Sequence, residues 1–241
     1  MDTLRRVAFN GINRGVIKIY DSVANRSYGG ASSDFTALLN IEGTTESVKA
    51  ISALVKTEVE NSGNFGSCAD STDDSLHGDT VFDVVHAAFA GDPSQNERML
   101  RSAVETDADD VDTQGGGWLF FLPYIPFDGQ AVLQARELLD QVRAETGVEC
   151  GSTVNALDAD VIDLVVTIRF TPNEHETDRA HRALDRLYEL FTAHGFRAYR
   201  LDVDHASEID AITGNAHEIE LQRRLKELLD PRTVIAPGRY A

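Results

Sequence analysis

Residues 118–125, WLFFLPYI, begin the part of the chain that decides the fold. This apolar run has the length of a buried strand, and Asp128 or Gly129 then opens a helix that Gly147 ends. The apolar positions of that helix recur at helical spacing and share one face: Val132, Ala135, Leu139 and Val142. The sequence therefore predicts a strand that leads directly into an amphipathic helix.

The segments that follow complete a pattern. Two strands are predicted at 148–155 and 161–170, the second reading VIDLVVTIRF. Asn173 can cap a long helix that Gly195 ends, and a last strand is predicted at 196–203. The order strand, helix, strand, strand, helix, strand is that of a ferredoxin-like unit. We therefore expect an α+β fold in which helices pack on a largely antiparallel sheet.

The first half of the chain predicts strands and helices in a shorter and less distinct version of the same order. Residues 2–13 have a loose helical stripe, and residues 16–23, VIKIYDSV, fit a strand or a helix. A strand is predicted at 35–41, and Thr44 can cap the helix after it. We expect the whole chain, 1–241, to form a single domain.

Two stretches are predicted as flexible loops because Gly, Ser and Asp dominate them: 61–80 and 106–117. Near the end of the chain, Asn215 and Glu218 resemble a capping box that starts a last helix, and Pro231 ends that helix.

Charge excludes several classes of partner. Lys and Arg number 22 against 40 Asp and Glu, so the formal net charge is −18. A surface this acidic repels nucleic acid and anionic membranes. The chain has no apolar run of membrane-spanning length and no signal-peptide pattern, so we expect a cytoplasmic protein. Its scarcity of Lys suits either a high-salt cytoplasm or a GC-rich genome.

General catalytic motifs are absent from the sequence. It contains no GxGxxG, no GxxxxGK[ST], no GxSxG and no CxxC. The acids Asp107, Asp109 and Asp112 do not follow the EF-hand pattern, and Cys68 and Cys150 read as free thiols. We expect no metal site.

One polar cluster lies in the last predicted strand. Tyr199 and Arg200 are adjacent, and Asp202, Asp204 and His205 follow. On a regular strand Tyr199 and Arg200 would point to opposite faces. A phenol beside a guanidinium can bind a phenolate or carboxylate through charge-assisted hydrogen bonds. The alternative is an ordinary amphipathic strand in which Arg200 pairs with an acid.

Four segments carry a resemblance to a known family. The tail at 229–240, LDPRTVIAPGRY, resembles the C-terminal signature of flavoproteins of the vanillyl-alcohol oxidase and p-cresol methylhydroxylase type. Residues 195–204, GFRAYRLDVD, look like the Tyr-Arg strand of that family, and 118–129 resembles a strand of its cap domain. Residues 1–13 are similar to the segment that enters the cap. Without the resemblance, the tail reads as a terminal strap packed on the domain.

The resemblance implies a chemistry. Members of the family bind FAD in an N-terminal domain and oxidise para-substituted phenols by hydride transfer to the flavin. Their cap places a Tyr and an Arg on the phenolate oxygen, and these match Tyr199 and Arg200 as catalytic and substrate-binding residues. Asp202 is a further candidate substrate contact, and Arg239 is a candidate contact to the cofactor.

Two departures from the family shape the prediction. The FAD-binding domain is missing from this sequence, so the chain is expected to be a cap subunit, or an excised cap, whose FAD is held by a partner chain. The residue that tethers FAD in several members falls near Asp163 or Leu164, and neither can form that bond, so FAD is expected to be non-covalent. An exposed apolar face, with 236–240 nearby, should mark where the flavin domain docks. The alternatives are a non-redox ligand-binding or regulatory module and a truncated relic.

Overall fold

The computed structural model describes residues 1–9, 16–32, 34–107, 109–156, 158–206, 215–235 and 237. The helices are α1 (Asp2–Phe9), α2 (Ser22–Ser27), α3 (Thr45–Ser62), α4 (Thr80–Phe89), α5 (Asn96–Ala103), α6 (Val111–Gln114), α7 (Gly129–Thr146), α8 (Glu174–Ala193) and α10 (Ala216–Leu229), with a 3₁₀ turn, η1, at Asp74–Leu76. The strands are β1 (Ile17–Tyr20), β2 (Thr36–Leu39), β3 (Gly117–Phe121), β4 (Pro123–Pro126), β5 (Gly151–Ala156), β6 (Val161–Phe170) and β7 (Arg197–Ala198).

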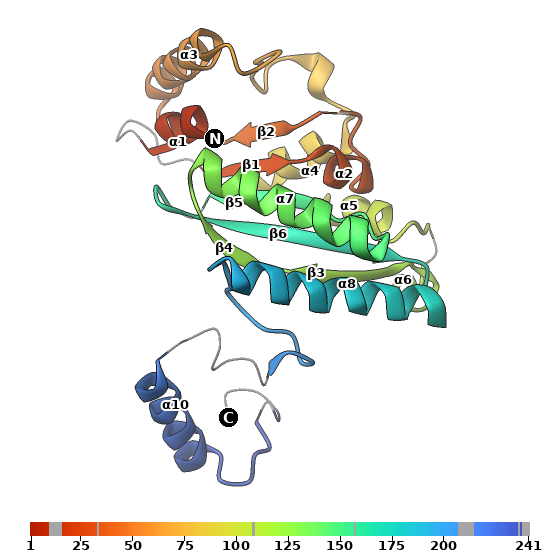
Figure 1. Cartoon of the computed structure of the whole chain (residues 1–241). Coiled ribbons are helices and arrows are strands. Elements are labelled where there is room, and N and C mark those ends of the chain that lie inside the picture. The colour runs from red at the N-terminus through yellow and green to blue at the C-terminus, as the bar shows by residue number, and fades with distance from the viewer. Residues whose placement is uncertain are drawn as a thin grey trace.

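The second half forms the predicted ferredoxin-like unit. β3 and β4 act as one strand, because both pair with β6 in a single register that runs from Gly117 opposite Phe170 to Pro126 opposite Val161. The sheet order β5-β6-β4-β7 is antiparallel throughout. Each helix therefore crosses over one intervening strand, and α7 and α8 lie side by side on the same face of the sheet (Figure 1).

Both crossover helices begin and end where their caps predict. The Asp128 side chain accepts a hydrogen bond from the Ala131 N–H at the start of α7, and Gly147 ends the helix at a φ of 72°. Asn173 caps α8 in the same way, through the Glu176 N–H. These caps satisfy backbone groups that the helix itself leaves unpaired.

The first half extends the same sheet. β1 pairs with β5 and with β2, both antiparallel, so the order continues as β2-β1-β5. The run at 16–23, which fits a strand or a helix, forms a strand and then the start of a helix, because Asp21 follows β1 and caps α2. The apolar run at 81–90 lies in α4, whose cap is Asp79. Figure 1 shows α4 and α5 behind the sheet, on the opposite side from α7.

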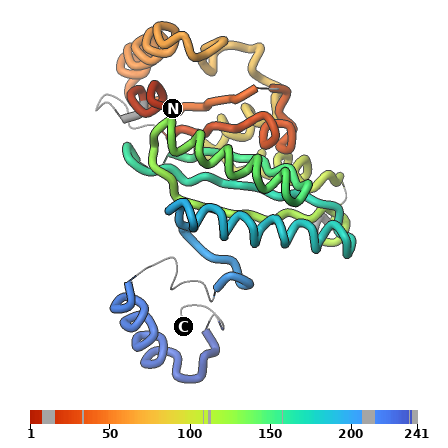
Figure 2. The backbone as a smooth tube through the Cα atoms, in the orientation of Figure 1, coloured from red at the N-terminus to blue at the C-terminus, as the bar shows by residue number. Residues whose placement is uncertain are grey.

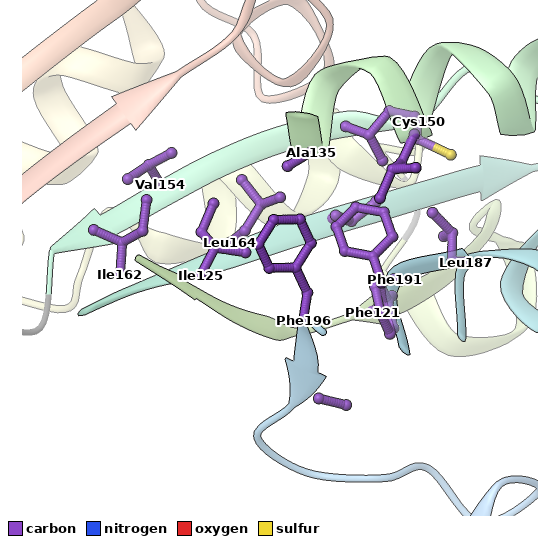
Figure 3. Close-up of a cluster of buried hydrophobic side chains, with 14 of the residues drawn as sticks. Phe121, Ile125, Ala135, Cys150, Val154, Ile162, Leu164, Leu187, Phe191 and Phe196 are labelled. Atoms are coloured by element: carbon purple, nitrogen blue, oxygen red, sulfur yellow. The ribbon is translucent and has the colours of Figure 1, made fainter. Parts of the chain in front are cut away.

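The main hydrophobic core lies between the sheet and helices α7 and α8. Figure 3 shows Phe121, Leu164 and Phe191 pointing into it, and all three are buried. The Phe191 ring contacts Phe121 edge-on at 5.1 Å between centroids. A smaller core on the other face joins α2, α4 and α5 to Tyr20, Tyr28 and Trp118.

Two local predictions need correction. The last strand is only Arg197–Ala198 and not 196–203, because the Asp202 side chain accepts hydrogen bonds from the N–H groups of Asp204 and His205 and turns the chain away. The loop predicted at 106–117 contains α6 and the start of β3, whereas 61–80 holds the end of α3, η1 and the start of α4 around an irregular stretch.

Helix α10 stands apart from the rest. It has no buried residue, and Figures 1 and 2 show it separated from the sheet and its helices. Asn215 caps it as predicted, accepting from the N–H groups of His217 and Glu218. None of the helices in the described ranges is both long enough and apolar enough to cross a membrane.

Candidate functional site

A row of polar side chains crosses the sheet on the face opposite α7 and α8. Strand pairing places Lys18 opposite Asn155, Asn155 opposite Asp163, and Asp163 opposite Tyr124. Side chains alternate along a strand, so the neighbours of these residues point into the core, as the buried Leu164 does. We call Lys18, Asn155, Asp163 and Tyr124 the polar row.

Tyr199 and Arg200 lie at the end of this row, just after β7. The Tyr199 N–H donates to the Leu122 carbonyl at 2.9 Å, and its ring packs on Tyr124 with centroids 5.3 Å apart. The Arg200 guanidinium lies 5.8 Å from the centre of the Tyr199 ring. Tyr124 and Tyr199 are 41% and 42% exposed, so both rings are available to a ligand.

The expectation that Tyr199 and Arg200 point to opposite faces was wrong. The strand ends before them, so strict alternation no longer applies to this pair. Burial raises the pKa of Asp163, and Arg200 lies close enough to that carboxyl to offset part of the rise. Two phenols and a guanidinium therefore share one corner of the sheet.

The Asp163 carboxyl of the polar row is half buried, which makes its ionised form unfavourable. Burial raises the pKa of Asp163, and the Asn155 amide, Arg200 and Lys18 offset part of that rise. Burial likewise lowers the pKa of Lys18, against the attraction of Asp163. One oxygen each of Asn155 and Asp163 is buried without a hydrogen-bond partner among the described residues. Shifted pKa values in partly buried charged groups are typical of functional sites.

Replacing Asp163 is expected to stabilise the fold. Because the pKa of Asp163 is raised, folding favours its protonated form. The protonated carboxyl therefore stabilises the fold at low pH, and this contribution is lost as the pH rises through the folded pKa. We expect Asp163→Asn to raise the free energy of unfolding at pH 7 by about 0.5 kcal/mol, a small value because the group is half exposed. Urea unfolding at pH 7 and at acid pH measures this.

The exposed Asp140→Asn on α7 is the matched control, and we expect it to leave the stability unchanged. A loss of stability in Asp163→Asn at pH 7 would show that the ionised carboxylate supports the fold.

Asp202 follows Arg200 by two residues, but its carboxylate binds other groups. It accepts from the backbone N–H groups of Asp204 and His205 and from the His205 ring. Burial works to raise the pKa of Asp202, but these hydrogen bonds lower it below its usual range. The carboxylate thus serves the turn that follows Tyr199 and Arg200. Arg239, the candidate cofactor contact, lies outside the described residues.

Comparison with known proteins gives the geometry a context. No protein-family model matches the chain. The chain is 22% identical, over 125 residues, to the 4-cresol dehydrogenase [hydroxylating] flavoprotein subunit of Pseudomonas putida, covering 52% of this chain and 24% of that protein. It superimposes on a crystal structure of p-cresol methylhydroxylase with substrate bound, with a TM-score of 0.81 at 16% identity. The fold is that of the p-cresol methylhydroxylase cap.

This likeness confirms the resemblance read from the sequence. The match to p-cresol methylhydroxylase covers 99% of this chain and 49% of that one. A second match is to 4-ethylphenol oxidase from Gulosibacter chungangensis in complex with isoeugenol, with a TM-score of 0.71, 12% identity, and coverage of 100% and 50%. The chain thus spans about half the length of the matched structures, and a quarter of the curated relative.

Sequence reasoning found only part of this site. It identified Tyr199 and Arg200, but it named Asp163 only as the position of a missing flavin bond. A signal was present, because Asp163 is the one acid inside the otherwise apolar first half of 161–170. Tyr124 and Lys18 carry no comparable signal, since strand pairing alone brings them to the same row.

Proposed function

We propose that this chain is the substrate-binding cap of a two-piece FAD-dependent oxidoreductase. It binds a phenol or another small aromatic substrate at Tyr199 and Arg200, and a separate chain holds FAD without a covalent bond to the cap. Bound FAD would supply the hydride acceptor. The observation that carries the proposal is the corner formed by Tyr124, Tyr199 and Arg200, in a chain with the fold of half of p-cresol methylhydroxylase.

Each residue of the corner has a task in this proposal. The Arg200 guanidinium favours the anionic form of a phenol and lowers the pKa of the bound hydroxyl. The Tyr199 hydroxyl donates a hydrogen bond to the same oxygen. The rings of Tyr124 and Tyr199 offer apolar surface to the substrate ring. The substrate is thereby held as the electron-rich phenolate from which hydride leaves more readily.

The residues present suit the ring of a flavin better than its phosphates. Lys18 brings positive charge to one end of the polar row, and Arg200 brings it to the other end, next to two exposed aromatic rings. The sequence has no glycine-rich phosphate-binding motif. This division supports a partner that binds the phosphates, and the curated relative is itself named as a flavoprotein subunit.

Helix α10 supports the same arrangement. Its apolar side chains are exposed, with Leu225 at 47%, Leu228 at 75% and Leu229 at 73%. The chain after the helix is nevertheless fixed, because the buried Asp230 accepts from Lys226 and from the N–H groups of Val234 and Ile235. An apolar surface that stays exposed among the residues that the structure describes fits a docking surface for the flavin-binding chain.

Co-expression with a flavin-binding polypeptide encoded beside this chain tests the proposal. We expect tagged chain to elute with that polypeptide and with bound flavin. The change Leu228→Glu places a charge in the apolar surface and should reduce the co-purified flavin about tenfold. The visible absorbance of the eluate, relative to its protein content, measures the effect.

The control His217→Glu adds the same charge at an exposed polar position of α10. It should leave the flavin content unchanged. Equal loss in both variants would contradict docking through the leucines, and a chain that binds phenols but elutes alone would indicate a ligand-binding module without redox chemistry.

A further inference from the structure

The segment that carries Tyr199 and Arg200 has little support from the sheet. β7 pairs with β4 only through Arg197 and Ala198, and the Tyr199 N–H makes the next hydrogen bond, to Leu122. After that bond the chain leaves the sheet. Something beyond Arg200 must therefore fix the direction in which both side chains point.

His205 is the anchor on that side. Although Val203 and Asp204 next to it are exposed, His205 is only 7% exposed. Its Nδ1 lies 2.9 Å from the Asp202 carboxylate, and its Nε2 lies 3.3 Å from that of Asp185. Each ring nitrogen therefore lies next to a carboxylate, one on the same segment and one on α8.

His205 contacts helix α8. The His205 ring stacks on Tyr188 at 3.9 Å between centroids and 17° between planes, and Tyr188 also packs on Phe121 in the core. Asp185 and Tyr188 lie on α8 three positions apart, so they share one face of that helix. The segment after Arg200 is thus held to α8 by the stacking of His205 on Tyr188 and by its polar contact with Asp185.

We infer that His205 is a positioning residue for the substrate site. With Asp185, Tyr188 and Asp202 it forms a latch, which holds the end of the segment while β7 holds its start. Tyr199 and Arg200 lie between these two fixed points, at the end of the polar row. That the latch positions a substrate site rests on the proposed function. That the latch fixes Tyr199 and Arg200 depends on this chain alone.

Binding of 4-nitrophenol, whose anion absorbs visible light, tests the latch in the full chain. Displacement of a binding group by about 1 Å costs up to a hundredfold in such sites. We expect His205→Ala to weaken binding of the anion about tenfold, and to raise the pKa of the bound phenol towards that of the free one. His205→Gln, which can still donate one hydrogen bond to Asp202, should recover part of the affinity.

A second measurement does not depend on any ligand. Hydrogen exchange at the Tyr199 amide should be about tenfold faster in His205→Ala, because the bond to Leu122 opens more often once the latch is released. Asp185→Asn removes only the more exposed acid and should give an intermediate rate. The control is His175→Ala, since His175 lies exposed in the first turn of α8.

The outcomes separate the two claims. Faster exchange at Tyr199, in a chain that binds no phenol, would retain the latch and overturn the proposed function. Unchanged exchange in His205→Ala and Asp185→Asn would overturn the latch, whatever the chain binds. Equal loss of affinity in His205→Ala and His205→Gln, with unchanged exchange at Tyr199, would also overturn it.

Discussion

Replacing Arg200 by alanine is expected to weaken phenolate binding by about a hundredfold, because a charge-assisted hydrogen bond of about 1.5–3 kcal/mol is lost. The pKa of the bound phenol should rise, since the guanidinium no longer favours the anion. In the complex with a flavin-binding chain, turnover should fall by a similar factor while the flavin content stays constant. Titration of 4-nitrophenol into the wild type and the variant measures the first two effects.

The matched control is Arg182→Ala, which removes an exposed guanidinium from α8. It leaves the net charge equal to that of Arg200→Ala, so any effect of total charge cancels. Tyr199→Phe keeps the ring and loses the hydroxyl, and it should cost about tenfold. Equal phenolate affinity in Arg200→Ala and Arg182→Ala would remove Arg200 from the site.

The largest effect on stability is expected from Phe191→Ala. Phe191 is fully buried in α8 and contacts Phe121 and Phe196, so its loss leaves a cavity between helix and sheet. Such changes cost about 3–5 kcal/mol, which lowers the Tm of a chain of this size by about 10 °C. Thermal unfolding followed by circular dichroism gives the value.

Leu133→Ala on α7 is the comparison, because Leu133 is 50% exposed. It should change the free energy of unfolding by no more than about 0.5 kcal/mol. Equal effects of the two substitutions would mean that the core does not lie between the sheet and α8.

The regular parts of the fold were predictable because their signals are local. Asp128 and Gly147 bound α7 as expected, and Asn173 begins α8 where its side chain can cap the helix. The strand at 196–203 was overestimated for an equally local reason. Apolar and polar residues alternate over 199–203, but Asp202 competes with the strand by accepting hydrogen bonds from the backbone two and three residues ahead.

The candidate site was predictable only where its residues are adjacent in sequence. Tyr199 and Arg200 stand together, and a family signature drew attention to them. Lys18 and Tyr124 are 106 positions apart, and they reach the same row through pairing with β5 and β6. Local periodicity contains no information about such partners. The cost of burying Asp163 is likewise set by neighbours from other strands.

The position of α10 shows a different limit. The sequence predicts a last helix that starts at Asn215 and carries Ile219, Leu225, Leu228 and Leu229, and that helix forms at Ala216–Leu229 with an exposed apolar face. Sequence periodicity cannot say whether such a face packs on its own chain or on another one. Within the described part of the chain the leucines of this face stay exposed, as expected of a surface that docks on a partner.

The most direct test of the central claim is to add 4-cresol, without oxygen, to the complex purified by co-expression. A phenol oxidised on this cap must reduce the flavin, so the visible absorbance of the oxidised flavin should disappear with the wild-type chain. In complexes made with Arg200→Ala the absorbance should disappear about a hundredfold more slowly. Flavin that stays oxidised in the wild-type complex with every phenol tested would contradict the assignment of this chain as the substrate cap of a phenol-oxidising flavoenzyme.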